Sequence, residues 1–521
     1  MRLTAWGGVD EIGGNKFLIE SGGARVFLDF GMSYDRDGYF FEPPFLQSAN
    51  REDLLKTRAL PPLTGCYRGA GLLAEYDPGT GPTGVAGIEE PKALDAMVLS
   101  HAHMDHYGYA GLLRPDIPIL ASPLTGRLIS MREDISAGFT TAEVSASLAM
   151  CEPGQPLEVG DLRLTPFAVD HSVPGATAWI IESEEVRVGY TGDLRMHGPA
   201  EGRAQTAAFL EALARNPVDY LLCEGTRLRP PESEDEKEVE HHGLVCEDDV
   251  AGKVGEIIER EPGLVVYDGS PADMGRMRIV CRAAIEAGRK LAVDAKLAYL
   301  LLYINRDQPL MDGCDEIARQ AYILLGRRKI ASNTTTARTI GRDGVFLETY
   351  DEGRQGHEKT LLAAQRIRRG NLKGDTADEL ASAIQIPDER FIWGPRREEV
   401  LANPGEWFVY TSNGPLTCLH FVTTPGCMRG TYVYGKAEPF NEEMEFSFER
   451  LKNWIELAGL KLEYAHTSGH MRAEHLKNFL REAGARRVIP IHTEAPEAFA
   501  ELHPDVRRSA AGEGVALSAA G

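Results

Sequence analysis

Short runs of β-branched and aromatic residues, separated by glycine-rich turns, dominate the first 225 residues of this 521-residue chain. This pattern predicts a meander of strands over residues 3–9, 15–20 and 24–30. Further strands are predicted at residues 96–100, 162–169, 176–182, 186–191 and 220–224, and a helix over residues 200–216. A Pro- and Gly-rich connection spans residues 31–92. A loop of that length usually has a function or covers a site.

A second α/β pattern follows a charged break between residues 227 and 249. The strand-like segments 263–268 and 291–295 lead into helical patterns that start at Ala272 and Leu297, which predicts a separate domain of βα units. The predicted elements of the tail are a helix over 446–457, a strand over 461–466, a helix over 473–483 and a strand over 487–491. Because a chain of this length exceeds what one hydrophobic core usually serves, two domains are expected.

The composition narrows the class of protein. An apolar content of 43% with 54 glycines is typical of an ordinary soluble α/β protein. No run of about 18 apolar residues is present, which predicts no membrane span, and the N-terminus lacks the apolar stretch of a signal peptide. Eight scattered cysteines without a Cys-x-x-Cys pair indicate reduced, mostly buried thiols. We therefore expect a cytoplasmic protein whose cysteines are poor candidates for metal ligands.

The net charge of −22 bears on the choice of substrate. A general nucleic-acid binder contacts phosphates through Lys and Arg, so this charge argues against that function. A local basic channel can nevertheless lie on an acidic protein. The net charge therefore does not exclude a nuclease.

Residues 101–106, His-Ala-His-Met-Asp-His, carry the most chemical information in the sequence. His101 and His103 are two residues apart at the end of a predicted strand, so their side chains face the same side and converge on one ion. Asp105 and His106 lie in the following turn, where they are placed for a second ion nearby. Imidazoles and carboxylates without thiolates suit Zn²⁺ or Mn²⁺. The segment therefore predicts a metal site.

Three further strand ends present ligand-type residues. His171 follows the predicted strand 162–169, Asp193 follows 186–191 and His492 follows 487–491. Each of these residues taken alone is more often a capping or core group. Together with residues 101–106 they form the pattern that a two-metal site along one edge of packed sheets requires, with Asp193 placed to bridge both ions.

These residues together resemble the metallo-β-lactamase superfamily and, within it, the β-CASP nucleases of the ribonuclease J type. The metal motifs of the superfamily are matched by Phe27-Leu-Asp29, His101–His106, His171 and Asp193. The β-CASP motifs are matched, in order, by Cys223-Glu224-Gly-Thr, His466-Thr-Ser-Gly-His470 and Pro490-Ile-His492. Because the chain continues for only about thirty residues after His492, it resembles the short, archaeal-like members that lack the bacterial C-terminal domain.

The resemblance implies an α/β fold, the metallo-β-lactamase αββα sandwich, with an inserted α/β β-CASP domain. Residues 1–225 would form the first part of the metallo-β-lactamase domain, residues 226–440 the β-CASP domain, and residues 441–521 the second part of the first domain. The nucleic acid would run between the two domains.

The resemblance also implies a ligand set for two divalent ions, with zinc expected and manganese as the alternative. One ion would be held by His101, His103 and His171, and the other by Asp105, His106 and His492, with Asp193 between them. Asp29 would hold the second nitrogen of a ligand or act as a plain capping carboxylate.

Roles in phosphodiester hydrolysis follow from the same resemblance. Asp105 would ligate and orient the nucleophile, and His470 would act as general acid while Glu224 holds its tautomer and raises its pKa. His466 and Ser468 would donate hydrogen bonds to a phosphate oxygen. Lys436 would meet a phosphate, since the chain has Gly435-Lys436 where relatives often carry two serines. The turn over residues 268–276 leaves open whether Arg276 contacts a phosphate or belongs to an ordinary glycine turn.

We therefore expect a metal-dependent ribonuclease that hydrolyses single-stranded RNA by 5′→3′ exonuclease action, endonuclease action or both. One alternative is a two-metal hydrolase of a small molecule (a lactam, a lactone or a phosphodiester), which the net charge favours. Another is a nuclease that acts on DNA. A non-catalytic scaffold is disfavoured, because such a protein would be expected to have lost ligands. A homodimer is one assembly that the sequence leaves open.

Overall fold

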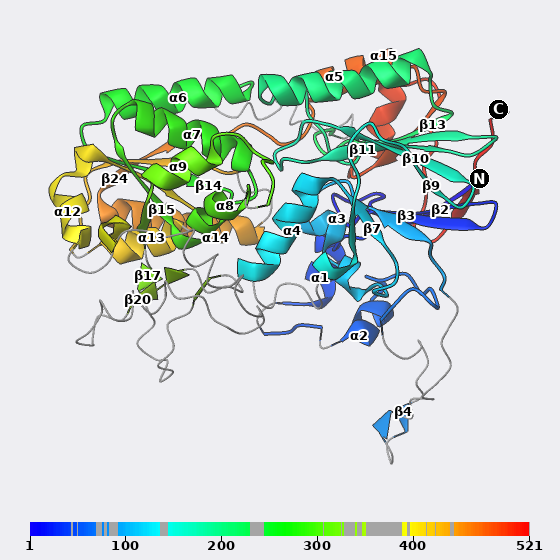
Figure 1. Cartoon of the computed structure of the whole chain (residues 1–521), viewed down its shortest axis with the longest axis horizontal. Coiled ribbons are helices and arrows are strands. Elements are labelled where there is room, and N and C mark those ends of the chain that lie inside the picture. Colours follow the sequence, from blue (N-terminus) through cyan, green and yellow to red (C-terminus); the bar gives the residue numbers. More distant parts are fainter. Residues whose placement is uncertain are drawn as a thin grey trace. The chain divides into compact units, whose positions relative to one another are not determined.

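The structure is a computed structural model, and the chain in it divides into two compact units (Figure 1). The first unit comprises Met1–Glu133, Ala137–Glu236 and Gly469–Gly521, and the second comprises Asp134–Ser136 and Lys237–Ser468. The structure describes residues 1–42, 45–48, 50–68, 76–77, 81–82, 92–135, 144–229, 244–305, 307–324, 326–327, 339–340, 346–347, 349–350, 388–392, 396–412, 414–422, 424–437 and 442–519. The predicted loop over 31–92 and the charged break after residue 227 lie partly outside these residues.

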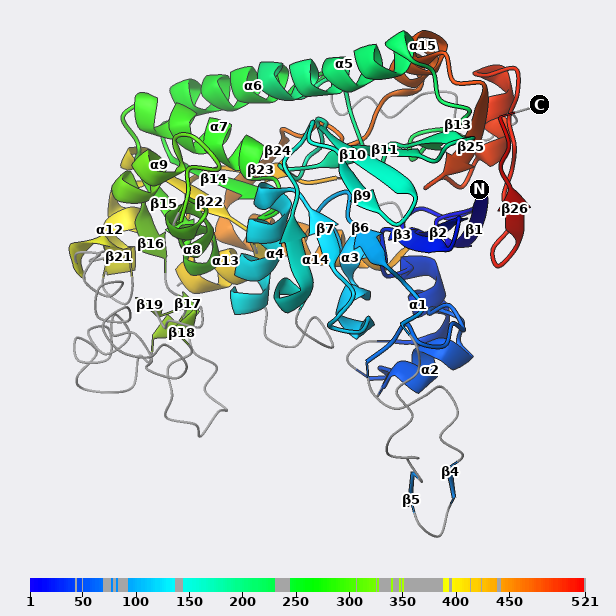
Figure 2. The same ribbon diagram turned by 45° about the vertical axis from the view of Figure 1, so that its right-hand side comes forward.

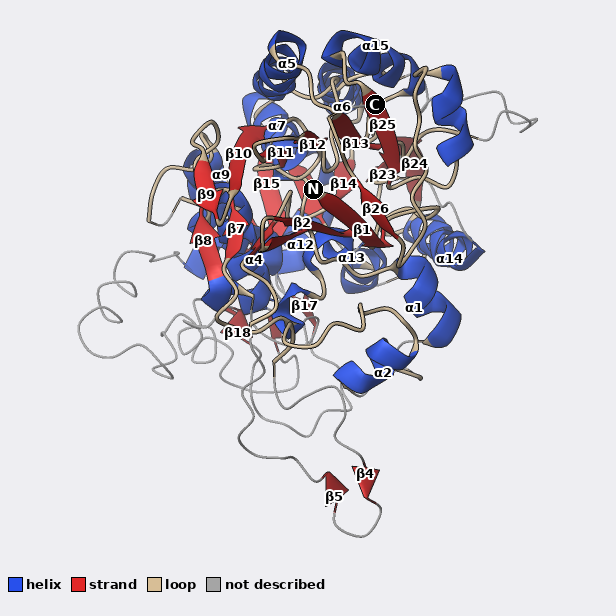
Figure 3. Cartoon of the chain, turned by 90° about the vertical axis from the view of Figure 1, so that its right-hand side faces the viewer, coloured by secondary structure: helices blue, strands red, loops and turns tan. Residues whose placement is uncertain are grey.

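Two sheets form the centre of the first unit (Figure 3). The first sheet has the order β26-β1-β2-β3-β6-β7-β8 and the second the order β25-β13-β12-β11-β10-β9. The strands of the first sheet are β1 (Arg2–Gly7), β2 (Lys16–Ser21), β3 (Ala24–Leu28), β6 (Ala96–Val98), β7 (Ile119–Ala121), β8 (Leu148–Met150) and β26 (Gly514–Ala516). Those of the second are β9 (Leu157–Val159), β10 (Leu162–Ala168), β11 (Thr177–Glu182), β12 (Arg187–Tyr190), β13 (Tyr220–Glu224) and β25 (Arg487–Ile491).

Side chains from both sheets share one core, which includes Leu3 and Val26 from the first sheet and Trp179 and Leu222 from the second. A second core lies between the second sheet and two helices, α5 (Ala200–Arg215) and α15 (Ala473–Ala483), which run side by side in Figure 3. Helix α15 buries Leu476, Phe479, Leu480 and Ala483, the spacing of one helical face. Helices α3 (Met104–Tyr107) and α4 (Pro123–Ile135) lie beside the first sheet (Figure 2). This is the αββα arrangement that the sequence predicted.

A seven-stranded parallel sheet organises the second unit, with the order β21-β16-β15-β22-β14-β23-β24. Its strands are β14 (Leu264–Gly269), β15 (Lys290–Asp294), β16 (Tyr322–Leu324), β21 (Phe391–Ile392), β22 (Trp407–Thr411), β23 (Gly430–Gly435) and β24 (Leu460–Tyr464). Its longer helices are α6 (Glu247–Arg260), α7 (Met274–Glu286), α8 (Ala295–Tyr303), α13 (Gly414–Phe421) and α14 (Glu442–Ala458). Parallel strands joined by helices are the βα pattern expected for the middle of the chain.

The chain returns from the second unit to the first at Gly469, whereas the sequence placed this return at residue 441. The physical reason is strand pairing. Strand β24 pairs in parallel with β23 over residues 460–464, and α14 shares the core of that sheet through Leu451 and Ile455. Both elements therefore belong to the second unit. Within the described residues, no helix has both the length and the apolar content needed to cross a bilayer.

Two loops of the first unit pack tightly against the start of α3. The backbone N–H of Asn15 donates to the carbonyl of Asp105 (3.1 Å), and that of Phe30 donates to the carbonyl of His106 (2.8 Å). The buried Lys16 ammonium joins the same loops, since it donates to the carbonyls of Gly14 (2.9 Å) and Gly31 (2.8 Å). Burial lowers the pKa of Lys16 to about 8. A Cβ atom on Gly31 would lie 1.6 Å from the carbonyl oxygen of Asp105, so only glycine fits there.

We predict that Gly31→Ala destabilises the first unit, because the added methyl group cannot avoid the Asp105 backbone. Overpacking of this kind costs about 1–3 kcal/mol or more. A thermal melt of the full chain should show a clear fall in Tm or loss of soluble protein. Gly38→Ala is the matched control, because a Cβ atom at Gly38 meets nothing within 4 Å. A Gly31→Ala protein that melts like the wild type would show that this packing is wrong.

Candidate metal centre

The end of strand β6 and the helix that follows it supply four of the predicted ligands. After β6, His101 and His103 lie in the short segment that leads into α3, and His103, whose backbone is extended, is the N-cap of that helix. Asp105 and His106 lie in α3, within the first turn. His101 and His106 are completely buried. The short helix therefore turns Asp105 and His106 away from the two preceding ligands and toward a second position.

Three other segments of the first unit deliver the remaining predicted ligands. His171 follows β10, Asp193 follows β12 and His492 follows β25. All three side chains are buried, with exposed fractions of 5%, 1% and 1%. His492 has a φ of +51°, a left-handed conformation that residues other than glycine rarely adopt. Glycine adopts this conformation without strain but has no imidazole. The strained backbone therefore indicates that the histidine side chain is needed at this position.

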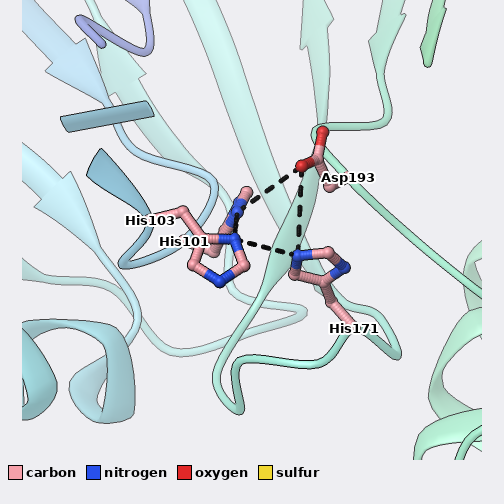
Figure 4. A group of neighbouring side chains, drawn as sticks. All are labelled: His101, His103, His171 and Asp193. Atoms are coloured by element: carbon pink, nitrogen blue, oxygen red, sulfur yellow. Dashed lines mark hydrogen bonds and ion pairs between the residues drawn. The ribbon is translucent and has the colours of Figure 1, made fainter. Parts of the chain in front are cut away.

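The first group consists of His101, His103, His171 and Asp193 (Figure 4). His103 Nδ1 lies 2.9 Å from His101 Nε2 and 3.2 Å from His171 Nε2. Asp193 Oδ2 lies 3.7 Å from His101 Nε2 and 3.9 Å from His171 Nε2. Three imidazole nitrogens and one carboxylate oxygen thus converge on one point.

The second group consists of Asp105, His106, Asp193 and His492. Asp193 Oδ2 lies 3.1 Å from His106 Nε2 and 3.5 Å from His492 Nε2. Asp105 Oδ2 lies 3.3 Å from His492 Nε2 and 3.8 Å from His106 Nε2. Because Asp193 belongs to both groups, the structure brings all seven predicted ligands into two adjoining sets.

Most of the imidazoles are oriented through the ring nitrogen that points away from the cluster. His106 Nδ1 donates to Asp29 Oδ2 (2.6 Å), and His171 Nδ1 donates to the carbonyl of Gly469 (2.7 Å). His101 Nδ1 lies 3.0 Å from Ser100 Oγ, which itself donates to Asp29 Oδ2 (2.6 Å). The proton on Nδ1 leaves the lone pair of Nε2 directed into the cluster, as metal-binding histidines require.

Asp29 thus acts on two ligand-type histidines at once, directly on His106 and through Ser100 on His101. It is completely buried, has a φ of +57° and also accepts a hydrogen bond from Tyr190 (2.5 Å). Asn15 Nδ2 donates in turn to the Tyr190 hydroxyl (3.1 Å). The sequence singled out Asp29 but not Ser100, Tyr190 or Asn15, because ordinary residues with distant partners leave no local signal.

Glu224 contacts His470 and, through Thr226, His492. Its Oε1 lies 3.2 Å from His470 Nδ1 and accepts from the backbone N–H of Leu194 (3.0 Å). Its Oε2 accepts from the Thr226 hydroxyl (2.6 Å), and Thr226 Oγ1 lies 2.8 Å from His492 Nδ1. Thr226 therefore lets His492 donate through Nδ1 and present Nε2 to the cluster. The sequence analysis included Thr226 in the motif Cys223-Glu224-Gly-Thr but gave it no role, because its contact with His492 joins segments far apart in the chain.

Burial and neighbouring charges set the protonation of these groups. Burial, with the adjacent imidazoles, holds the pKa of His101 well below its usual value. Burial also lowers the pKa of His103 to about 4. For His470, burial acts downward, but Glu224 and Asp193 outweigh it and raise the pKa to about 9. His101 and His103 are therefore neutral at neutral pH, as ligands must be, whereas His470 carries a proton.

The residues fit divalent metal ions. Seven nitrogen and oxygen ligands in two groups, each with all its ligand atoms within 4.8 Å of one another, match the preferences of Zn²⁺ and similar ions. Among the described residues, buried His106 Nε2 and Asp193 Oδ1 make no hydrogen bond. A buried polar atom without a partner is costly. Cations bound by these two side chains would offset that cost.

The three residues predicted to contact substrate from the middle of the chain all lie in the second unit. His466 Nδ1 lies 2.6 Å from Arg276 Nη1. Ser468, half-buried, is the last residue before the chain returns to the first unit. Lys436 Nζ lies 2.7 Å from the buried Asp268 carboxylate and donates to the carbonyl of Ser412 (3.0 Å). The charge of Lys436 is therefore already paired with a carboxylate.

Comparison with known proteins places these features in context. A family model described as a beta-lactamase superfamily domain matches residues 77–297. A ribonuclease J from Sinorhizobium meliloti is 25% identical over 293 residues, which cover 55% of this chain and 49% of that protein. A ribonuclease J from Pyrococcus abyssi is 28% identical over 233 residues, 44% of this chain and 46% of that protein. The chain thus spans about half the length of these curated relatives.

The fold is also similar to that of a solved structure along nearly its whole length. A protein of unknown function from Enterococcus faecalis matches with a TM-score of 0.66 and 20% identity, and the alignment covers 99% of both chains. At this identity the likeness concerns the fold alone. The fold therefore recurs in a crystal structure.

We predict that Ser100→Ala weakens metal binding although Ser100 is not a ligand. Without its hydroxyl, His101 loses the partner that fixes its ring, and losses of this kind cost about 10- to 100-fold in affinity. Competition with a fluorescent chelator would measure the change in Kd for Zn²⁺. Ser183→Ala removes a hydroxyl from a turn between β11 and β12 and serves as the control. Equal Zn²⁺ affinities of the wild type and both variants would show that the hydrogen bond between Ser100 and His101 does not contribute to metal binding.

Proposed function

Because this chain contains a metallo-β-lactamase superfamily domain and is related to the ribonucleases J, we propose that it is a metal-dependent ribonuclease. The observation that carries the proposal is the pair of ligand groups that share Asp193 and adjoin the Glu224–His470 pair. A metal site beside a protonated imidazole provides both requirements of phosphodiester hydrolysis, an activated water and a proton for the leaving oxygen.

In this proposal two divalent ions, zinc with manganese as the alternative, bind in the first unit. His101, His103 and His171 hold one ion, Asp105, His106 and His492 hold the other, and Asp193 lies between them. Bound divalent ions supply a water of lowered pKa and offset negative charge on the reacting phosphate. Within the described residues, the carboxylates of the two ligand groups are those of Asp105 and Asp193.

The remaining chemistry belongs to side chains of this protein. Asp105, half-buried beside His492, orients the water that attacks phosphorus. His470 holds a proton on the ring nitrogen that does not face Glu224 and delivers it to the leaving 3′-oxygen. Glu224 fixes the ring through Nδ1 and keeps it charged before the transfer. His466 and Ser468 donate to a phosphate oxygen of the substrate.

We further propose single-stranded RNA as the substrate, cut by 5′→3′ exonuclease action, endonuclease action or both. A second candidate is hydrolysis of a small molecule by the same metal centre. The net charge of −22 favours this candidate, because a polyanionic substrate is repelled by an acidic protein. The same centre acting on DNA is the third outcome that the experiment below separates.

The test uses 5′-labelled and 3′-labelled single-stranded RNA, and DNA of the same sequence, incubated with purified protein and Zn²⁺ or Mn²⁺. We predict RNA cleavage that His103→Ala and His470→Ala each reduce at least about 100-fold, since the first removes a ligand and the second the general acid. The pattern of labelled products distinguishes exonuclease from endonuclease action. His475→Ala, a histidine of α15 outside both ligand groups, should cut like the wild type.

The outcomes discriminate among the three functions. Cleavage of DNA but not RNA identifies a DNA nuclease. Intact polymers in the presence of tightly bound metal contradict a nuclease and favour a small-molecule hydrolase. Cleavage that survives His103→Ala would come from a contaminant or from another site, and would contradict the proposed metal centre.

A further inference from the structure

A buried arginine in the second unit lies outside the metal centre and is not used in the chemistry described above. Arg276, in the first turn of α7, has only 3% of its surface exposed. Its guanidinium forms a two-pronged ion pair with the buried Glu247, with Nε–Oε2 at 3.0 Å and Nη2–Oε1 at 2.5 Å. Asp273 Oδ2 lies 3.4 Å from Nη1. A buried guanidinium is costly unless its charge and its donors are matched, and here two carboxylates match them.

The other side of the same guanidinium reaches the segment that follows β24. Nη2 donates to the carbonyl of Thr467 (2.7 Å), and Nη1 lies 2.6 Å from His466 Nδ1. Nη1 also lies 3.4 Å from the carbonyl of Gly435, at the end of β23. One side chain therefore joins the starts of α6 and α7 to the loop that carries His466, Thr467 and Ser468.

These contacts decide the tautomer of His466. Arginine has donors only and does not give up a proton in proteins, so His466 Nδ1 must accept and carries no hydrogen. The Gly435 carbonyl, 3.2 Å from Nδ1, then accepts from the same Nη1 rather than from the imidazole. The single proton of the neutral ring is left on Nε2. A second proton on Nδ1 would face the guanidinium directly, which keeps the ring neutral.

The surroundings of His466 suit a phosphate. His466 follows β24 and Gly435 is the last residue of β23, so both lie at the carboxyl ends of parallel strands, where α/β sheets commonly bind anionic ligands. Lys436, next in the chain, keeps 30% of its side chain exposed beside the Asp268 carboxylate. Arg276 itself is too deeply buried to meet a polymer, and its nitrogens already contact Glu247, Thr467 and His466.

We propose that Arg276 is a positioning residue that fixes His466 as a neutral Nε2–H donor for a phosphate oxygen of bound RNA. The phosphate contact rests on the proposed ribonuclease function, whereas the tautomer rests on the structure of the second unit alone. The guanidinium thus contributes to RNA binding through a histidine that it orients, not through a charge of its own on the substrate.

The first test is the protonation state of His466 in the intact protein. With ¹⁵N-labelled histidine, NMR spectra identify which ring nitrogen carries hydrogen, and His466→Ala assigns the signal by its absence. We predict the Nε2–H tautomer over the whole neutral range. In Arg276→Met combined with Glu247→Gln, which removes both buried charges together, the signal should show mixed tautomers. Arg278 lies on the same helix, and its Nη1 donates to the carbonyl of Asp312 (3.1 Å). Arg278→Gln should therefore leave the wild-type pattern and serves as the control.

The second test measures binding of a fluorescent single-stranded RNA to metal-free protein. His466→Ala and the double variant should each weaken the Kd about tenfold or more, the effect expected for losing one hydrogen bond to a charged group. Arg278→Gln should bind like the wild type, although it removes one positive charge, whereas the double variant leaves the net charge unchanged. If the double variant fails to fold by circular dichroism, Arg276→Lys replaces it, because lysine keeps the charge but lacks the planar fork.

Each result decides one statement. A wild-type spectrum with hydrogen on Nδ1 overturns the role of Arg276, whatever the protein does to RNA. Unchanged RNA binding by His466→Ala overturns the phosphate contact and leaves the ribonuclease proposal standing. A wild type that cuts no RNA with any metal overturns the proposed function, while the spectrum still decides the tautomer.

Discussion

The carboxylate of Asp193 is the group on which the arrangement of the first unit depends. Its Oδ2 lies between 3.1 and 3.9 Å from nitrogens of His106, His492, His101, His171 and His470. A fully buried charge is tolerated only if compensating groups surround it, so each neighbouring element has to end where it can deliver one. The two sheets provide these compensating groups because strands β6, β10, β12 and β25 all end near the Asp193 carboxylate.

Side chains around the cluster hydrogen-bond to its histidines and hold their rings in place. Asp29 accepts from His106 directly and is linked to His101 through Ser100. Glu224 contacts His470 directly and is linked to His492 through Thr226. Such partners fix ring orientation and raise ligand basicity, which affects metal affinity nearly as much as the ligands do. The left-handed backbone at Asp29 and His492 is one cost of this arrangement.

The sequence predicted which seven side chains the structure brings into the two ligand groups, because these residues share a local signature, a histidine or aspartate just after an apolar strand. Nine strands of the two sheets in the first unit were also placed within about two residues, because alternation and glycine turns mark them. The short strands β7, β8, β9 and β26 were not predicted, because three residues are too few to show an alternating pattern. The return of the chain to the first unit was placed too early, since the apolar face of α14 does not tell which sheet it covers. Ser100, Thr226 and the pairing of Lys436 with Asp268 depend on contacts between distant segments, and no local pattern reveals those.

The central claim is that seven side chains of the first unit hold two divalent ions around Asp193. The most direct measurement is the metal content of the protein after dialysis against buffered Zn²⁺, by elemental analysis and by mass spectrometry under native conditions. We expect two ions per wild-type chain and at most one in Asp193→Ala, with the fold intact by circular dichroism. A wild type that retains no ion or one ion, or an Asp193→Ala variant that still holds two, would contradict the claim.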